Sequence, residues 1–199
     1  MTENEQQVAA LLLAAGGGRR LGGRPKALLE HRGRPLVEHA VGVLRAAGCT
    51  RVHVVLGAAA AVVRERAELG GCVLVENPEW ADGMGSSLRA GLDSLAGTGA
   101  RAALVSLVDQ PGIGAGAVRR VLAAYEGETS LVSAAYHGVR GHPVLFGAAH
   151  WTGISATATG DRGARAYLKE HQRALTLVEC GDVAEPYDID TPVDLAHLE

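Results

Sequence analysis

Two cations follow a glycine-rich turn near the start of the chain. An apolar run, 8–15, ends directly in Gly16, Gly17 and Gly18, and Arg20 and Lys26 come next. Glycines let another molecule approach the backbone closely. Free loop N–H groups and basic side chains meet phosphate oxygens without competing carboxylates. The segment therefore predicts a polyphosphate site.

Two common phosphate-binding motifs do not fit this turn. In the P-loop register, Gly18 and Gly23 continue as Arg24 and Pro25, where a lysine and a hydroxyl are required. In the dinucleotide register GxGxxG, the last glycine falls on Leu21. No acidic residue stands out at the distance expected for a ribose contact. The chemistry of phosphate binding remains, without either of these two motifs.

Alternating apolar and helical segments must position this turn. They predict a three-layer α/β/α domain with a mostly parallel, Rossmann-like sheet. Ligands of such sheets bind beyond the carboxyl ends of the strands, so the Gly16 turn and Asp109, which ends another strand, belong to one rim. The segment 152–160 is rich in small and hydroxyl residues and reads as a mobile loop. Strands are expected at 8–15, 51–56, 72–75, 102–108, 131–135, 143–146 and 175–179, and helices at 35–47, 58–69, 86–95, 115–125, 163–171 and 192–198.

The composition of the chain limits the number of domains and the kinds of partner that are expected. The chain has 199 residues, 47% hydrophobic and 21% charged, which predicts one domain over 1–199 with a flexible terminus at 1–7. A formal net charge of -3 argues against broad binding of nucleic acid. Cys49, Cys72 and Cys180 are widely spaced, so no zinc site or disulfide framework is indicated. Without a signal peptide or a membrane-spanning run, a cytoplasmic protein with no membrane contact is expected.

The first segment resembles a known signature. Leu13-Ala14-Ala15-Gly16, followed by Arg20, Gly22 and Lys26, is similar to the loop of nucleotidyltransferases with a glycosyltransferase-A-like fold. Gly18 and Leu21 depart from the Ser and Met that are frequent there, and both cations are retained. The resemblance implies phosphate contacts from Arg20 and Lys26. It also implies nucleotide binding by Leu13, Ala14, Ala15, Gly16, Gly17 and Gly18.

A second stretch resembles a more specific group. Residues 77–88, which include Gly83 and Ser87, are similar to the NPxWxxGMxxSL element of molybdenum cofactor cytidylyltransferases. By that likeness Gly83 and Ser87 lie near the nucleobase and ribose. A plainer reading is a helix capped by Ser86 with Trp80 filling the core. Both readings can hold together.

Two acidic elements extend the likeness. Residues 108–111 resemble the family's VDQP element, and 188–195 resemble its DIDTPEDL ending. The resemblance implies Mg²⁺ bound by Asp109 and by Asp190, with Asp188 as second choice, because a hard dication takes oxygen ligands. Asp194 instead fits the first turn of a helix that begins at Pro192.

The rest of the chain is expected to hold the acceptor. Residues 141–143 and 160–165 also resemble family elements, which makes His142, Arg162 and Arg165 candidate acceptor-binding residues. Read without the resemblance, His142 is a structural histidine and the arginines lie on a solvated helix face.

The resemblance implies transfer of CMP from CTP to the phosphate of molybdopterin cofactor, with release of pyrophosphate. Residues 14–16 resemble the cytidylyltransferase version of the loop, where a Cβ at Ala15 would narrow the base pocket and favour a pyrimidine. Such transfer requires positioning and charge neutralisation, and no general base, because the attacking phosphate is already ionised. The alternatives are a GTP-using guanylyltransferase, another cytidylyltransferase with a small phosphorylated acceptor, a family-related NAD(P)H oxidoreductase, or a module that only delivers cofactor. A transient partner, a molybdoenzyme or its chaperone, is a further expectation.

Overall fold

A seven-stranded sheet forms the centre of the computed structural model, which describes residues 7–198. The strand order is β5-β4-β1-β6-β8-β7-β9. Neighbouring strands run parallel except around β8, which is antiparallel to both β6 and β7. The strands are β1 Val8–Ala14, β4 Val52–Leu56, β5 Val73–Glu76, β6 Ala102–Leu107, β7 Leu131–Tyr136, β8 Val139–Gly147 and β9 Leu175–Glu179, and β2 Glu30–His31 pairs with β3 Arg34–Pro35 in a separate hairpin.

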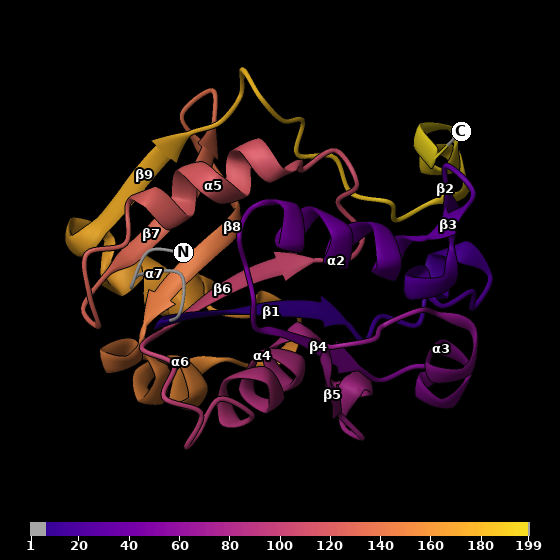
Figure 1. Cartoon of the computed structure of the whole chain (residues 1–199), viewed down its shortest axis with the longest axis horizontal. Coiled ribbons are helices and arrows are strands. Elements are labelled where there is room, and N and C mark those ends of the chain that lie inside the picture. Colours follow the sequence, from indigo (N-terminus) through magenta and orange to yellow (C-terminus); the bar gives the residue numbers. More distant parts are fainter. Residues whose placement is uncertain (1–6, 199) are drawn as a thin grey trace.

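Helices cover both faces of the sheet, as Figure 1 shows with α2 and α5 on one side and α4 and α6 on the other. Side chains of β1 alternate between two cores: Leu12 joins the core under α2 and α5, and Leu11 joins the core under α4 and α6. A strand covered on both faces is apolar along its whole length. The predicted three-layer fold is therefore confirmed. The helices are α2 Leu36–Ala46, α3 Ala60–Arg66, α4 Met84–Asp93, α5 Ala115–Ala123, α6 Trp151–Thr157 and α7 Arg165–Glu170.

The segment 152–160 differs from its prediction as a loop. Most of it is helix α6, which ends at Thr157. Ile154 is fully buried, and the indole N–H of Trp151 donates to the carbonyl oxygen of Phe146 at 2.9 Å. Tertiary packing therefore holds a helix that the local composition does not favour. The predicted closing helix is a 3-10 helix, Pro192–Leu198, and the predicted flexible terminus lies outside the described residues except for Gln7.

The register of three parallel strands gathers their carboxyl ends. Leu13 of β1 pairs with Val55 of β4 and with Leu107 of β6. The residues that follow these strands therefore emerge at one edge of the sheet. Strand β8 pairs Val144 with Val105 in the antiparallel sense, so the start of β8 reaches the same edge.

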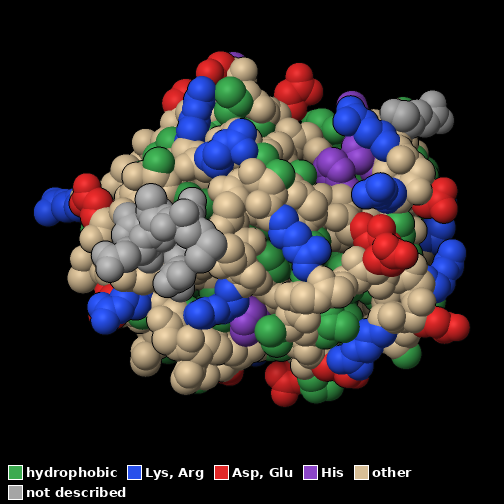
Figure 2. Space-filling view, in the orientation of Figure 1, with side chains coloured by type: hydrophobic (Ala, Val, Ile, Leu, Met, Phe, Trp, Pro, Cys, Tyr) green, Lys and Arg blue, Asp and Glu red, His purple; other side chains and the backbone are tan. Residues whose placement is uncertain are grey.

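The surface carries charges of both signs (Figure 2), as expected for a formal net charge of -3. On the face in Figure 2, Lys and Arg side chains are interspersed with Asp and Glu rather than gathered into one basic patch. Across residues 7–198, no helix combines the length and apolar character needed to cross a membrane.

Candidate active site

The glycine turn after β1 folds back on itself. Gly18 has a φ of 58°, and a Cβ there would collide with the carbonyl oxygen of Arg24. The N–H groups of Leu21 and Gly23 both donate to the carbonyl oxygen of Gly18, and the N–H of Lys26 donates to that of Gly16. Within the described part of the chain, the N–H groups of residues 16–18 have no acceptor. The turn thus has free N–H groups at residues 16–18, and its backbone bond to Gly16 brings Lys26 close to them.

Lys26 joins two distant carboxylates. Its Nζ donates to Asp109 Oδ2 at 2.6 Å and also to Asp190 Oδ1. The Lys26 and Asp109 side chains are only 14% and 19% exposed, so solvent screens this pair weakly. Burial lowers the pKa of Lys26, but the two carboxylates outweigh burial and raise the pKa above its usual value. Arg20 reaches Asp190 at 3.8 Å from the open side. The sequence motifs therefore meet in one centre.

Backbone bonds hold the acidic segments together. The N–H of Ile189, a fully buried residue, donates to the carbonyl oxygen of Asp109 at 2.9 Å. Asp194 accepts from the N–H groups of Asp190 and Thr191 at 3.0 and 2.7 Å. It lies in the first turn of the 3-10 helix that begins at Pro192, in the structural place the sequence predicts. The fold therefore fixes Asp190 at its position beside Lys26.

Asp188 has a different partner from Asp190. Its Oδ1 accepts from the side-chain amide of Gln110 at 2.8 Å. Burial raises the pKa of Asp188, and the nearby charges of Asp109 and Asp190 raise it further. Of the two acids weighed from sequence, Asp190 is the one that contacts Lys26.

A cleft of about 950 Å³ opens over this centre. It is large enough for a nucleotide with a second small molecule. Ala14 is 1% exposed, packs in the core under α2 and α5, and does not line the cleft. The other site residues named from sequence all line it: Leu13, Ala15, Gly16, Gly17, Gly18, Arg20, Lys26, Gly83, Ser87, Asp109, His142, Arg162, Arg165, Asp188 and Asp190.

Asn77 braces the segment that carries Gly83 and Ser87. Its buried side-chain amide donates to the hydroxyls of Ser86 and Ser87 at 2.9 and 3.1 Å, and its oxygen accepts from the N–H of Glu79. Helix α4 begins at Met84 with no side-chain cap, so the expectation that Ser86 caps a helix is wrong. The Ser86 hydroxyl instead donates to carbonyl oxygens of the same segment. Sequence reasoning did not assign Asn77 this bracing role, although it stands in the quoted motif.

The cleft also receives three arginines and a histidine from the second half of the chain. His142 lines it together with Arg162, Arg165 and also Arg140, which the sequence analysis missed. Arg140 stands two residues before His142 on β8, and the two-residue period of a strand was the signal that could have found it. Burial, followed by the charges of Arg165 and Arg140, lowers the pKa of His142 to about 4. His142 is therefore neutral near pH 7, in surroundings that favour an anion.

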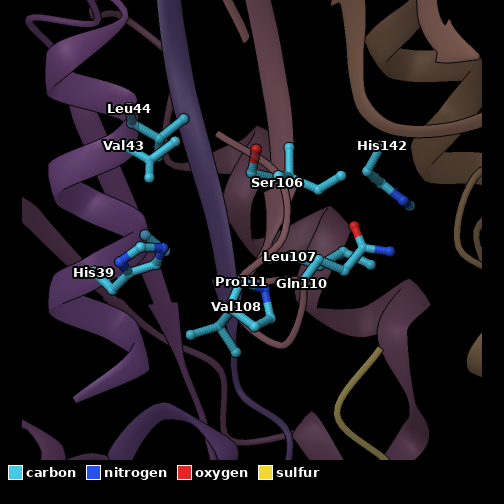
Figure 3. A pocket seen from close by; sticks show the side chains of 11 residues that line it. His39, Val43, Leu44, Ser106, Leu107, Val108, Gln110, Pro111 and His142 are labelled. Atoms are coloured by element: carbon cyan, nitrogen blue, oxygen red, sulfur yellow. The ribbon is translucent and has the colours of Figure 1, made fainter. Parts of the chain in front are cut away.

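A second hollow lies behind the loop that carries Asp109. Figure 3 shows His39 of α2 and His142 of β8 on opposite sides of it, with Gln110 and Pro111 at its end. Its volume is about 20 Å³, the space of one water molecule. In the described chain, His39 Nε2 and Gln110 Oε1 are buried without a hydrogen-bond partner. This hollow is too small for a substrate.

A family model describes most of this architecture. The MobA-like NTP transferase domain matches residues 10–174, which contain the glycine turn, Lys26 and Asp109. The chain belongs to the MobA-like NTP transferase family. It is accordingly a nucleotidyltransferase, as the resemblance implied. The family match ends before Asp190, so the contact between Asp190 and Lys26 is information that the structure adds.

Relatives of this MobA-like protein carry different names. It is 43% identical over 187 residues to nicotine blue oxidoreductase of Paenarthrobacter nicotinovorans, covering 90% of each chain. A Mycobacterium sp. strain JC1 homologue of Rv0371c from Mycobacterium tuberculosis superposes with a TM-score of 0.83, at 30% identity and 97% coverage of both chains. The manganese complex of Rv0371c itself gives 0.75 at 26% identity, covering 96% and 97%. Manganese is thus present in a structure of this fold.

Proposed function

We propose that the protein transfers CMP from CTP to the phosphate of a phosphorylated pterin, the molybdopterin form of the molybdenum cofactor, and releases pyrophosphate. One observation carries the proposal: Lys26, Asp109 and Asp190 meet directly beside a turn of free amides. A cation, two acids and free N–H groups at one point suit a metal-bound triphosphate.

The glycine turn and two cations would hold the triphosphate. The free N–H groups at 16–18 suit its non-bridging oxygens, and Lys26 and Arg20 offset its charge. Lys26 is mostly buried and held from two sides, whereas the Arg20 side chain is 75% exposed. Lys26 therefore acts from a fixed place, and Arg20 is free to move with the ligand.

The two carboxylates fit a hard divalent cation. Asp109 Oδ2 and Asp190 Oδ1 both contact one atom, Lys26 Nζ, so their oxygens converge on a common point. Few protein carboxylates, with phosphate oxygens and water completing the shell, is the pattern that Mg²⁺ prefers. Mg²⁺ at Asp109 and Asp190 would offset negative charge on the α-phosphate and on the leaving pyrophosphate.

The preference for cytosine as the nucleobase of the donor rests on Ala15 and Ser87. Ala15 lines the cleft, as do Gly83 and Ser87. A methyl group at this place narrows the pocket and favours cytosine over guanine. Ser87 Oγ accepts from Asn77, so its own hydrogen is left to donate. These features support CTP as the donor.

The arginines that the second half of the chain contributes to the cleft suit a phosphorylated acceptor. Arg140, Arg162 and Arg165 line the cleft, and their side chains form no ion pair within residues 7–198. A phosphate monoester is ionised near neutral pH, so its oxygen can attack without a general base. His142 is neutral there and needs no acidic partner. The chain's own role is to orient two anions toward each other and exclude water.

A second candidate is oxidation of a pigmented aromatic compound with a nicotinamide cofactor. It is favoured by the 43% identity to nicotine blue oxidoreductase. The absence of GxGxxG after β1 disfavours it, because that turn otherwise carries the dinucleotide's pyrophosphate. A GTP-dependent guanylyltransferase would share the same triphosphate site and differ at Ala15.

The deciding experiment incubates the protein with each nucleoside triphosphate, Mg²⁺ and isolated molybdopterin cofactor, and measures pyrophosphate. Release with CTP above GTP, absent in Asp109→Ala of unchanged fold, supports the proposal. Parallel assays follow NADPH oxidation with quinone-like aromatics. NADPH oxidation without pyrophosphate release overturns the proposal in favour of the oxidoreductase. If neither reaction occurs and Asp109→Ala still delivers cofactor to a partner enzyme, the protein is a carrier.

A further inference from the structure

Trp80 lies against the backbone of two turns at the rim of the sheet. It begins the 3-10 helix Trp80–Asp82, and Gly83 follows that helix. A Cβ added to Gly17 would stand 2.9 Å from Cζ3 of the indole, and one added to Gly57 would stand 2.7 Å from its Cγ. Such distances leave no space for a side chain, so Trp80 is packed directly on both backbones. The indole bridges the phosphate turn after β1 and the turn after β4.

The segment that carries the indole is braced on both sides. Asn77, three residues before Trp80, bonds to Ser86, Ser87 and the N–H of Glu79. The Ser86 hydroxyl donates to the carbonyl oxygen of Glu79 at 2.8 Å. These contacts close a ring around the short helix, so Trp80 is held in one place before any ligand arrives.

The two tryptophans of the chain differ in their polar atom. The indole N–H of Trp151 donates to the carbonyl oxygen of Phe146 and has a structural place. No acceptor within residues 7–198 receives the N–H of Trp80, and this atom is not among the buried unpartnered ones. It is therefore accessible to solvent, on a side chain that lines the cleft. A half-buried aromatic ring with a free donor is suited to contact a ligand.

We propose that Trp80 is a donor-binding residue against which the nucleoside part of the triphosphate packs. The ring packs on the turn at Gly17, which suits phosphates, and it lines the same cleft as Gly83, which follows its short helix. A nucleoside joined to phosphates at this turn can therefore reach it. An aromatic face attracts every heteroaromatic base and gives affinity without selecting one. Ala15 would then choose the base and Trp80 would hold it. This inference rests on the proposed nucleotide donor and assigns a residue to it.

Fluorescence of one tryptophan tests the contact. Trp151→Phe leaves Trp80 as the sole tryptophan, since the chain has two. Titration of this variant with CTP or GTP in Mg²⁺ is expected to change its emission to saturation, at the affinity that calorimetry gives. Trp80→Phe, which keeps Trp151, should stay unresponsive while it binds CTP. Calorimetric binding of CTP without an emission change in Trp151→Phe overturns the assignment.

A substitution of Trp80 tests whether the residue contributes affinity for the nucleoside without selecting the base. Trp80→Leu is expected to raise the Kd and KM of CTP and GTP by the same factor, roughly tenfold or more, with little change in kcat. Trp80→Phe should fall between. Loss of kcat and thermal stability at unchanged Kd would make Trp80 a structural filler and refute the proposal. If the wild-type protein binds no nucleoside triphosphate by calorimetry, the proposed function itself fails, which is a result distinct from unresponsive Trp80 fluorescence.

Discussion

The ammonium of Lys26 lies 2.6 Å from Oδ2 of Asp109, although 83 residues separate the two positions. One residue comes from the turn after β1 and the other from the end of β6, and these strands are parallel neighbours. Asp190 completes the same centre from the segment before the last 3-10 helix. The predicted phosphate cation and the predicted metal ligands thus form one cluster of linked charges, and a change at one member acts on the others.

Replacing Lys26 with methionine should lower kcat by roughly 10²- to 10³-fold, the effect of losing one fixed charge-stabilising donor. Asp109 and Asp190 would then face each other with only the exposed Arg20 near Asp190 as a counter-charge, and unfolding free energy should fall by about 1 kcal/mol after allowance for solvent. Pyrophosphate release and urea unfolding measure the two effects. Lys26→Arg should stay impaired, because a planar guanidinium does not replace a compact ammonium between two acids. Full activity in Lys26→Met would contradict the proposed phosphate role.

The two C-terminal acids should respond differently to amide substitution. Asp190→Asn removes a charge that contacts Lys26, and activity should fall by more than roughly 100-fold, with a higher Mg²⁺ requirement. Asp188→Asn keeps an oxygen that can accept from Gln110 and removes a charge that makes no contact with Lys26, so a loss of roughly tenfold is expected. Mg²⁺ titrations of pyrophosphate release compare them. Asp182→Asn, whose carboxylate pairs with Arg120 on the surface, is the matched control. A larger loss at Asp188 than at Asp190 would reverse the assignment.

Much of the fold was readable because strand and helix periods differ. The run 8–15 is apolar throughout, which a strand covered on both faces requires, and Asp109 could be placed beside the Gly16 turn from the edge rule for parallel sheets. Helix α6 was missed because its stability comes from buried Ile154 and the Trp151 contact rather than from its small residues. The strands β2 and β3 are only two residues long each, which is too short for the two-residue period of a strand to be recognised in the sequence.

The residues that gather at the site were also predicted only in part. Motif positions identified the residues that emerge at the strand ends, but not which neighbours pack on them. Ala14 was assigned to the nucleotide with Leu13 and Ala15, yet successive residues of a strand face opposite sides, and its side chain enters the core under α2 and α5. Trp80 looked like core filler because its contact with Gly17 depends on tertiary packing.

Ala15→Gly should shift base preference. Removing the Cβ widens the pocket, and the ratio of kcat/KM for GTP over CTP should rise by about tenfold, the usual value of one methyl-sized contact. Competition kinetics with the two triphosphates measure the ratio. Trp80→Leu should leave the ratio unchanged while weakening both substrates. An unchanged ratio in Ala15→Gly would remove the argument for a size-selected pyrimidine.

Arg140→Gln should raise the KM of the phosphorylated acceptor with the KM of CTP unchanged. The residue lines the cleft, has no ion pair within the described chain, and lies near neutral His142. A charge-assisted bond to phosphate contributes about 1.5–3 kcal/mol, or at least tenfold in affinity. Arg173→Gln, an exposed change outside the cleft, is the control. An equal rise in the KM of CTP would place Arg140 at the donor instead.

Acid should destabilise the protein through His142. Its folded pKa of about 4 lies below the ordinary value near 6.5, because burial and the charges of Arg165 and Arg140 disfavour the protonated ring. The folded state therefore binds fewer protons than the unfolded state between these values. The contribution to stability is complete above pH 6.5 and is lost as pH falls toward 4. Urea unfolding of wild type and His142→Gln from pH 7.5 to 4.5 should show a shallower fall in the variant, while His137→Asn, at the exposed hairpin tip, should follow the wild type. Parallel curves for His142→Gln and wild type would mean that the ring is not held neutral. A bound phosphate at Arg140 and Arg165 would offset their charge, so the acceptor should raise the pKa of His142 and reduce this dependence.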